Sequence, residues 1–97
     1  MIKVVINTCY GGFGLSKEAE ELYESRTGEF FSDYDTPRHD PTLVKLVEEL
    51  GPSAAGASFS DLTIVEVEGD RYYIKEYDGY ESVVTPADIE RMWVVVA

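Results

Sequence analysis

The first third of the chain combines an apolar run, a glycine-rich segment and an amphipathic segment. Ile2–Asn7 (IKVVIN) is a short run of mostly β-branched residues closed by polar and glycine residues, which predicts a central strand buried on both faces. Ser16 is a good helix N-cap, and apolar residues gather on one side of the segment that follows it. We therefore expect a helix over residues 17–26, ended by Gly28.

A polar segment without periodicity separates this helix from a second one. Residues 29–39 (EFFSDYDTPRH) are typical of a long surface loop, and loops of this length are often functional. Asp40 then offers an N-cap and Pro41 a first helical position. Leucine and valine recur at helical spacing over residues 43–50 until Gly51, which predicts a second helix with one apolar face.

The second half of the chain has the short runs and turn residues of β-structure. Glu-Gly-Asp at 68–70 and Asp-Gly at 78–79 are strong hairpin signals. They separate the runs of an expected three-stranded antiparallel meander, residues 61–67, 71–77 and 80–84. A short helix is expected from residue 86 to residue 92, and residues 93–96 (WVVV) suit a last strand or an apolar tail.

The order of these elements, β-α-α-β-β-β, predicts one domain of the α+β class over residues 1–97. In this arrangement two helices cover one face of a small mixed or antiparallel sheet. The composition agrees with a folded domain, since 44% of the 97 residues are apolar. The chain is therefore expected to fold by itself.

The charge of the chain limits its partners. Nineteen Asp and Glu residues against eight Lys and Arg give a formal net charge of -11. Such a field repels nucleic acid and anionic lipid, so we expect no direct binding of nucleic acid or membrane, whereas a basic partner is easily accommodated. No apolar run of about 18 residues occurs and no signal peptide is recognisable, which predicts a cytoplasmic protein.

A single cysteine and a single histidine limit the chemistry. Cys9 cannot form an internal disulfide, and with His39 alone no zinc set can be assembled, so no metal or other cofactor is expected. Cys9 lies near a helix start, a position that suits nucleophilic cysteines. Nothing in the sequence brings His39 beside it, however. We therefore interpret Cys9 as a packing residue and expect no catalytic residues.

The glycine-rich segment is the most informative local feature. Gly11, Gly12 and Gly14 allow unusual backbone conformations and close approach of a ligand, and the helix N-terminus at Ser16 favours an anion. The spacing GGFG matches neither the dinucleotide nor the P-loop fingerprint. Two interpretations stay open, a tight structural connection and a loop that a phosphate approaches.

Two further segments carry candidate binding groups. Arg38 can fork onto a phosphate or carboxylate of a ligand, or it can pair with Asp33 or Asp35 nearby, while the N-cap role explains Asp40. Residues 76–81 (EYDGYE) hold three carboxylates around an Asp-Gly turn, which are expected to be solvated. The tyrosines of the predicted meander suit sheet packing and a half-exposed aromatic surface of the kind common at interfaces.

Three of these segments resemble a family of small acidic proteins encoded mainly by bacteriophages and prophages. The likeness is carried by KVVINTCYGGFGLS at 3–16, by Arg38 with the helix that follows Asp40, and by EYDG at 76–79. It weakens between residues 28 and 37 and after Tyr80. The resemblance implies a viral accessory protein inside a bacterium and supplies no mechanism. Its matching positions are Asn7, residues 9–14, Arg38, Asp40, Tyr77 and Asp78.

These features favour a non-catalytic binding protein, and its expected role is counter-defence. The first hypothesis is sequestration of an anionic nucleotide-type ligand by helix-end N–H groups, a guanidinium and an aromatic face. Its ligand-binding residues would be Asn7, Tyr10, Gly11, Gly12, Phe13, Gly14, Ser16, Arg38, Tyr77 and Asp78. The alternative is an acidic inhibitor that imitates DNA and docks on a basic site of a host protein. A small Cys- or carboxylate-dependent enzyme is the third hypothesis, and residues 93–96 are a candidate seam for a homo-oligomer.

Overall fold

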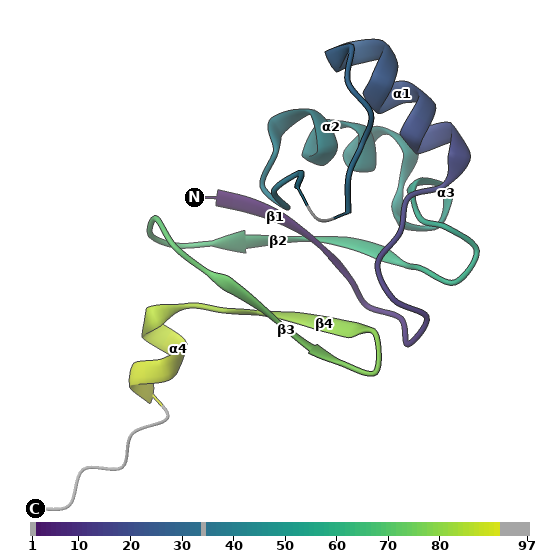
Figure 1. The fold of residues 1–97 in the computed structure, drawn as a ribbon. Coiled ribbons are helices and arrows are strands. Elements are labelled where there is room, and N and C mark those ends of the chain that lie inside the picture. The colour runs from purple at the N-terminus through teal and green to yellow at the C-terminus, as the bar shows by residue number, and fades with distance from the viewer. Residues whose placement is uncertain (1, 34, 92–97) are drawn as a thin grey trace, which may run out of the picture.

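A computed structural model describes residues 2–33 and 35–91 (Figure 1). The elements in chain order are β1 (Ile2–Asn7), α1 (Lys17–Thr27), α2 (Pro41–Leu50), α3 (Pro52–Ala55), β2 (Leu62–Val67), β3 (Tyr73–Tyr77), β4 (Tyr80–Val84) and α4 (Pro86–Arg91). The α+β class is confirmed. The expected terminal strand or tail at 93–96 lies outside the described residues.

The four strands form two antiparallel pairs. β1 pairs with β2, in a register that sets Ile2 opposite Val67 and Asn7 opposite Leu62, and β3 pairs with β4 as a hairpin. The predicted three-stranded meander is therefore wrong in its first strand, because β2 joins β1 and not β3. β1 and β2 carry apolar side chains on both faces and can therefore lie between two cores. The β3–β4 hairpin has exposed residues on its outer face.

Side chains from the two faces of the β1–β2 pair enter two different cores. Val5 packs with Leu62 and with apolar residues of α1, α2 and α3, among them the fully buried Leu43 and Leu46. On the other face, Val4, Ile6 and Val67 pack against residues of β3 and β4. The molecule thus has three layers, with α1–α3 above the β1–β2 pair and the hairpin below it in Figure 1. The prediction that two helices cover one face of a sheet is confirmed.

The helix ends form as the sequence predicts. The Ser16 hydroxyl accepts from the N–H of Ala19 at the start of α1, and Gly28 ends this helix with a φ of 76°. The Asp40 carboxylate accepts from two N–H groups in the first turn of α2, where Pro41 stands at the first helical position. The caps at Gly28 and Asp40 fix where the loop that contains Arg38 begins and ends.

Candidate functional site

Asn7, at the end of β1, is fully buried and connects four segments of the chain. Its Nδ2 donates to the carbonyl oxygens of Cys9 at 2.5 Å and Gly79 at 2.8 Å. Its Oδ1 accepts from the N–H of Asp61 at 2.9 Å, and its own N–H donates to Glu81 Oε1 at 2.8 Å. An unsatisfied buried amide costs about 1 to 3 kcal/mol. These bonds therefore fix the glycine loop (residues 8–15), the β3–β4 turn and the start of β2 relative to one another.

Arg38 lies beside β1 and forms a two-point ion pair with Glu81 of β4. Nη1 is 2.6 Å from Oε1, Nη2 is 2.9 Å from Oε2, and the two side chains are 16% and 6% exposed. The sequence offers Asp33 and Asp35 as nearby partners, but the carboxylate comes from a strand 43 residues away. A paired and bidentate geometry of this kind is what permits two charges to be buried together.

The same two residues close one edge of β1. Val5 donates its N–H to the backbone oxygen of Arg38 at 2.9 Å, and its carbonyl accepts from Arg38 Nη1 at 3.3 Å. Two residues further along the strand, on the same edge, the N–H of Asn7 donates to Glu81. The edge of β1 that faces away from β2 thus has a loop, a guanidinium and a carboxylate in place of a neighbouring strand.

An aromatic ring covers the Arg38 guanidinium. Its Cζ lies 3.5 Å from the ring centroid of Phe13, within the range of a cation–π contact. Phe13 in turn packs on Phe31, with ring centroids 6.1 Å apart, and Phe31 packs edge-on against Tyr23 of α1. The structure therefore brings the predicted site residues Phe13 and Arg38 together, with the cation already paired and covered.

Glycines in the loop and in the hairpin turn allow backbone segments to approach each other closely. A Cβ on Gly11 would lie 2.1 Å from the carbonyl oxygen of Phe59, and a Cβ on Gly79 would lie 2.6 Å from the carbonyl oxygen of Tyr10. Gly12 has a φ of +98°, and a Cβ there would meet nothing within 4 Å. The loop is thus packed at Gly11 and open at Gly12.

The end of the glycine loop is occupied by contacts within the chain. A Cβ on Gly14 would lie 3.3 Å from the Phe59 ring, and the Gly14 oxygen accepts from Ala57 N–H. The Ser16 hydroxyl caps α1 and donates to the carbonyl oxygen of Ala54 at 2.7 Å. Both residues thus connect α1 to the segment after α2, which is the role expected for a tight structural connection.

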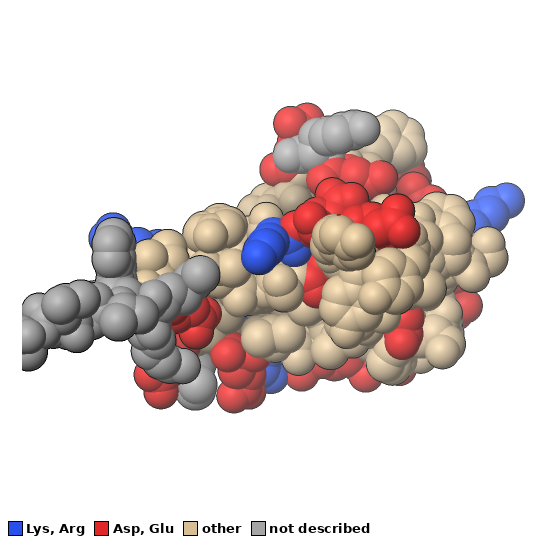
Figure 2. Space-filling model, turned by 90° about the horizontal axis from the view of Figure 1, so that it is seen from below, with Lys and Arg blue, Asp and Glu red and all other residues tan. Residues whose placement is uncertain are grey.

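Three exposed tyrosines gather where the glycine loop meets the hairpin turn. Tyr10, Tyr77 and Tyr80, which we call the tyrosine platform, are 64%, 76% and 40% exposed. The rings of Tyr10 and Tyr80 are 5.4 Å apart between centroids, and Tyr77 and Tyr80 are cross-strand partners. Figure 2 views the molecule from the hairpin side, where uncharged surface is bordered by acidic side chains and a basic side chain also lies on this face. Asp78, in the turn between Tyr77 and Gly79, is exposed there too.

The structure does not join Cys9 to His39. Cys9 is half-buried in the glycine loop. The His39 Nδ1 lies 2.7 Å from the Tyr72 hydroxyl, and the two rings meet edge-on. Burial raises the pKa of Tyr72 above its usual value. Within residues 2–33 and 35–91, no group of three or more His, Cys, Asp or Glu is arranged to hold a metal ion.

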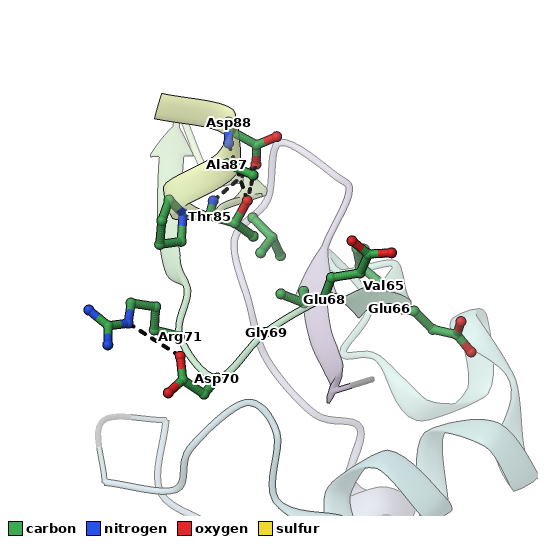
Figure 3. A pocket seen from close by; sticks show the side chains of 12 residues that line it. Val65, Glu66, Glu68, Gly69, Asp70, Arg71, Thr85, Ala87 and Asp88 are labelled. Atoms are coloured by element: carbon green, nitrogen blue, oxygen red, sulfur yellow. Dashed lines mark hydrogen bonds and ion pairs between the residues drawn. The ribbon is translucent and has the colours of Figure 1, made fainter. Parts of the chain in front are cut away.

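A groove of about 860 Å³ lies away from these residues, between the end of β2 and α4 (Figure 3). Its walls include Glu66, Glu68 and the exposed pair of Asp70 with Arg71. The Asp88 carboxylate on its α4 side accepts from the N–H and the hydroxyl of Thr85 and so caps that helix. None of the site residues predicted from the sequence lines this groove.

Glu81 is the one residue at the centre of the site that the sequence reasoning treats as solvated. The pattern of β4 contains a signal for its burial, because Glu81 lies on the same face of the strand as Val83. Val83 packs on the core formed by Val4, Ile6 and Val67. A carboxylate on an inward face is costly to bury unless it is paired with a cation or hydrogen-bonded. Arg38 supplies that cation.

The comparisons with known proteins find no likeness. No protein-family model, curated protein or solved structure matches the chain. Among the helices of residues 2–33 and 35–91, none combines the length and the hydrophobicity needed to cross a bilayer.

Proposed function

We propose that this protein acts without catalysis, by docking an acidic surface on a basic site of a host protein. The observation that carries the proposal is the ion pair of Arg38 with Glu81. The cation that a phosphate ligand would need is neutralised by a carboxylate and has Phe13 over its plane. The tip of the adjacent hairpin exposes Tyr77, Asp78 and Tyr80, and such an aromatic and acidic surface suits a positively charged partner.

The net charge supports the same function. A charge of -11 on 97 residues produces a long-range field that accelerates the approach of a basic partner and weakens as salt is added. A basic site that normally holds nucleic acid is a natural target for such a field. The resemblance to small phage proteins fits this role, since an accessory protein of that kind would act on host or defence machinery in the cytoplasm of an infected bacterium.

Sequestration of an anionic nucleotide-type ligand is a second candidate, favoured by the open side of the glycine loop. Gly12 has free space where a side chain would stand, and Tyr10 and Tyr77 present exposed rings on which a base could stack. A phosphate would have to replace Glu81 as the partner of Arg38. That exchange breaks a buried, two-point ion pair, which makes this candidate the weaker one.

Affinity purification from bacterial cells separates the two candidates. We expect a host nucleic-acid-binding protein to be retained at low salt and released at high salt, and we expect its nucleic acid to be displaced when the acidic protein is added in equal amount. The same preparation is then acid-precipitated and its supernatant analysed by mass spectrometry. A nucleotide released from the protein, together with no salt-sensitive protein partner, would overturn the docking proposal in favour of sequestration.

A further inference from the structure

We infer that the tyrosine platform is the docking surface, and that it binds arginine side chains presented by the partner protein. This inference rests on the proposed function and narrows it to one place on the molecule. Tyr10, Tyr77 and Tyr80 are large side chains with much of their area in solvent. Tyrosine is among the residues that contribute most to binding at protein interfaces.

The backbone that carries the platform is fixed by hydrogen bonds and close packing before any partner arrives. Asn7 holds the backbone on both sides of it, through the carbonyl oxygens of Cys9 and Gly79. Gly79 lets the hairpin turn approach the Tyr10 backbone so closely that no Cβ would fit between them. Because the rings of Tyr10 and Tyr80 are already in contact, binding of a partner costs little entropy for ordering these two side chains.

The chemistry of the surroundings favours a cation, and arginine in particular. The exposed carboxylate of Asp78 lies in the turn next to Tyr77, within a chain of net charge -11. A guanidinium can stack on a tyrosine ring and still direct its N–H groups to a carboxylate, whereas an ammonium group is a compact point charge. Arg38 over Phe13 shows the same pairing of ring, guanidinium and carboxylate inside this protein.

The binding surface is confined to the hairpin tip. Lys75 lies on the same face of β3 as Tyr77, two positions further from the turn, and it is exposed. Its positive charge opposes a second cation at that place. The arginine-binding part of the face therefore ends before Lys75 and excludes the exposed Tyr73 beyond it.

The test measures binding of a fluorescent peptide in which arginine alternates with glycine, and of a matched lysine peptide. We expect wild-type protein to bind the arginine peptide more tightly than the lysine peptide at equal charge. Replacing Tyr10 and Tyr77 together by alanine should weaken arginine-peptide binding about five- to thirtyfold, as expected for losing two cation–π contacts. The control for an exposed ring is Phe30→Ala, since Phe30 is 81% exposed and lies in the loop after α1.

A charge control makes the outcomes distinguishable. Glu18→Gln with Glu20→Gln removes two carboxylates in the first turn of α1, which is not part of the platform. If this variant loses as much affinity as the tyrosine variant, or if the tyrosine variant binds like wild type, the platform inference is overturned while docking by acidic surface survives. If wild-type protein fails to bind either peptide at low salt, the proposed function itself is overturned.

Discussion

Replacing Glu81 by glutamine tests whether the buried ion pair holds the hairpin to β1. Glutamine has nearly the same size, and its oxygen can still accept from the N–H of Asn7. The replacement removes the negative charge that faces Arg38 and leaves that guanidinium charged. Because the Arg38 side chain is only 16% exposed, water compensates little of the loss.

The expected cost follows from the geometry. Removing one member of a buried pair costs about 3 to 5 kcal/mol when the other charge stays behind. A neutral hydrogen bond from the guanidinium to the new amide returns about 0.5 to 1.5 kcal/mol of this. We therefore expect Glu81→Gln to lower the free energy of unfolding by about 2 to 4 kcal/mol, out of the roughly 5 to 15 kcal/mol typical of a natural domain.

Urea unfolding followed by circular dichroism measures this change. The matched control is Glu48→Gln, which removes one partner of the exposed ion pair with Lys3 and should cost no more than about 1 kcal/mol. A double-mutant cycle with Arg38→Met completes the experiment. Once the unpaired cation is gone, the second substitution should cost less than it does alone, with a coupling energy of about 1 kcal/mol or more.

Two results would refute this reasoning. One is a Glu81→Gln protein whose free energy of unfolding stays within about 0.5 kcal/mol of the parent, the range of ordinary surface substitutions. The other is strict additivity in the cycle, since residues in direct ionic contact should not behave independently. Either result would mean that the two side chains do not form the pair that closes the edge of β1.

Three further predictions concern stability. Replacing Leu46, which is fully buried in α2, by alanine should lower the free energy of unfolding by about 2 to 4 kcal/mol. An unchanged urea midpoint would contradict the packing of α2 on the β1–β2 pair. Gly79→Ala should destabilise by more than about 1 kcal/mol, because φ is +88° and its Cβ would collide with the Tyr10 oxygen; thermal unfolding at the parent temperature would contradict this close approach. Burial raises the pKa of Tyr23, so ionisation is easier in the unfolded chain. The stability contributed by this hydroxyl is complete below about pH 10 and is lost as the pH rises through the raised value, a loss that Tyr23→Phe should remove in urea titrations at several pH values.

The helices and their ends could be predicted because their signals are local. Ser16, Asp40 with Pro41, and the glycines at 28 and 51 each act on the turn next to them, and the structure has them as caps. Strand partners are decided by distant residues instead. The hairpin signals at 68–70 and 78–79 look equally strong, but only the second joins paired strands, because β2 is needed beside β1 between the two cores.

The site shows the same division. The sequence points to Asn7, the glycine loop, Arg38 and Tyr77 as site residues, and the structure brings Asn7, this loop and the hairpin turn together through hydrogen bonds. The partner of Arg38 could not be predicted from the sequence, since a ligand and a neighbouring aspartate fit the sequence equally well. Arg38 pairs with Glu81 because the Glu81 side chain points to the inner face of the hairpin. A register shift of one residue in β4 would have turned that carboxylate to solvent.

The bond from the N–H of Asn7 to Glu81 joins residues 74 positions apart, and the bond from its side chain to Gly79 spans 72. Contacts so distant in sequence are slow to form, because the loop between them must first be ordered. During synthesis, β1 is made well before its partners in the β3–β4 hairpin. Until then, the N–H of Val5 can already bond to the Arg38 carbonyl, but the N–H of Asn7 has no partner and leaves this end of the strand edge open to pairing with other chains. A protein truncated before β4 would keep the Asn7 N–H unpaired, so completing the hairpin also shields this end of β1 from pairing with other chains.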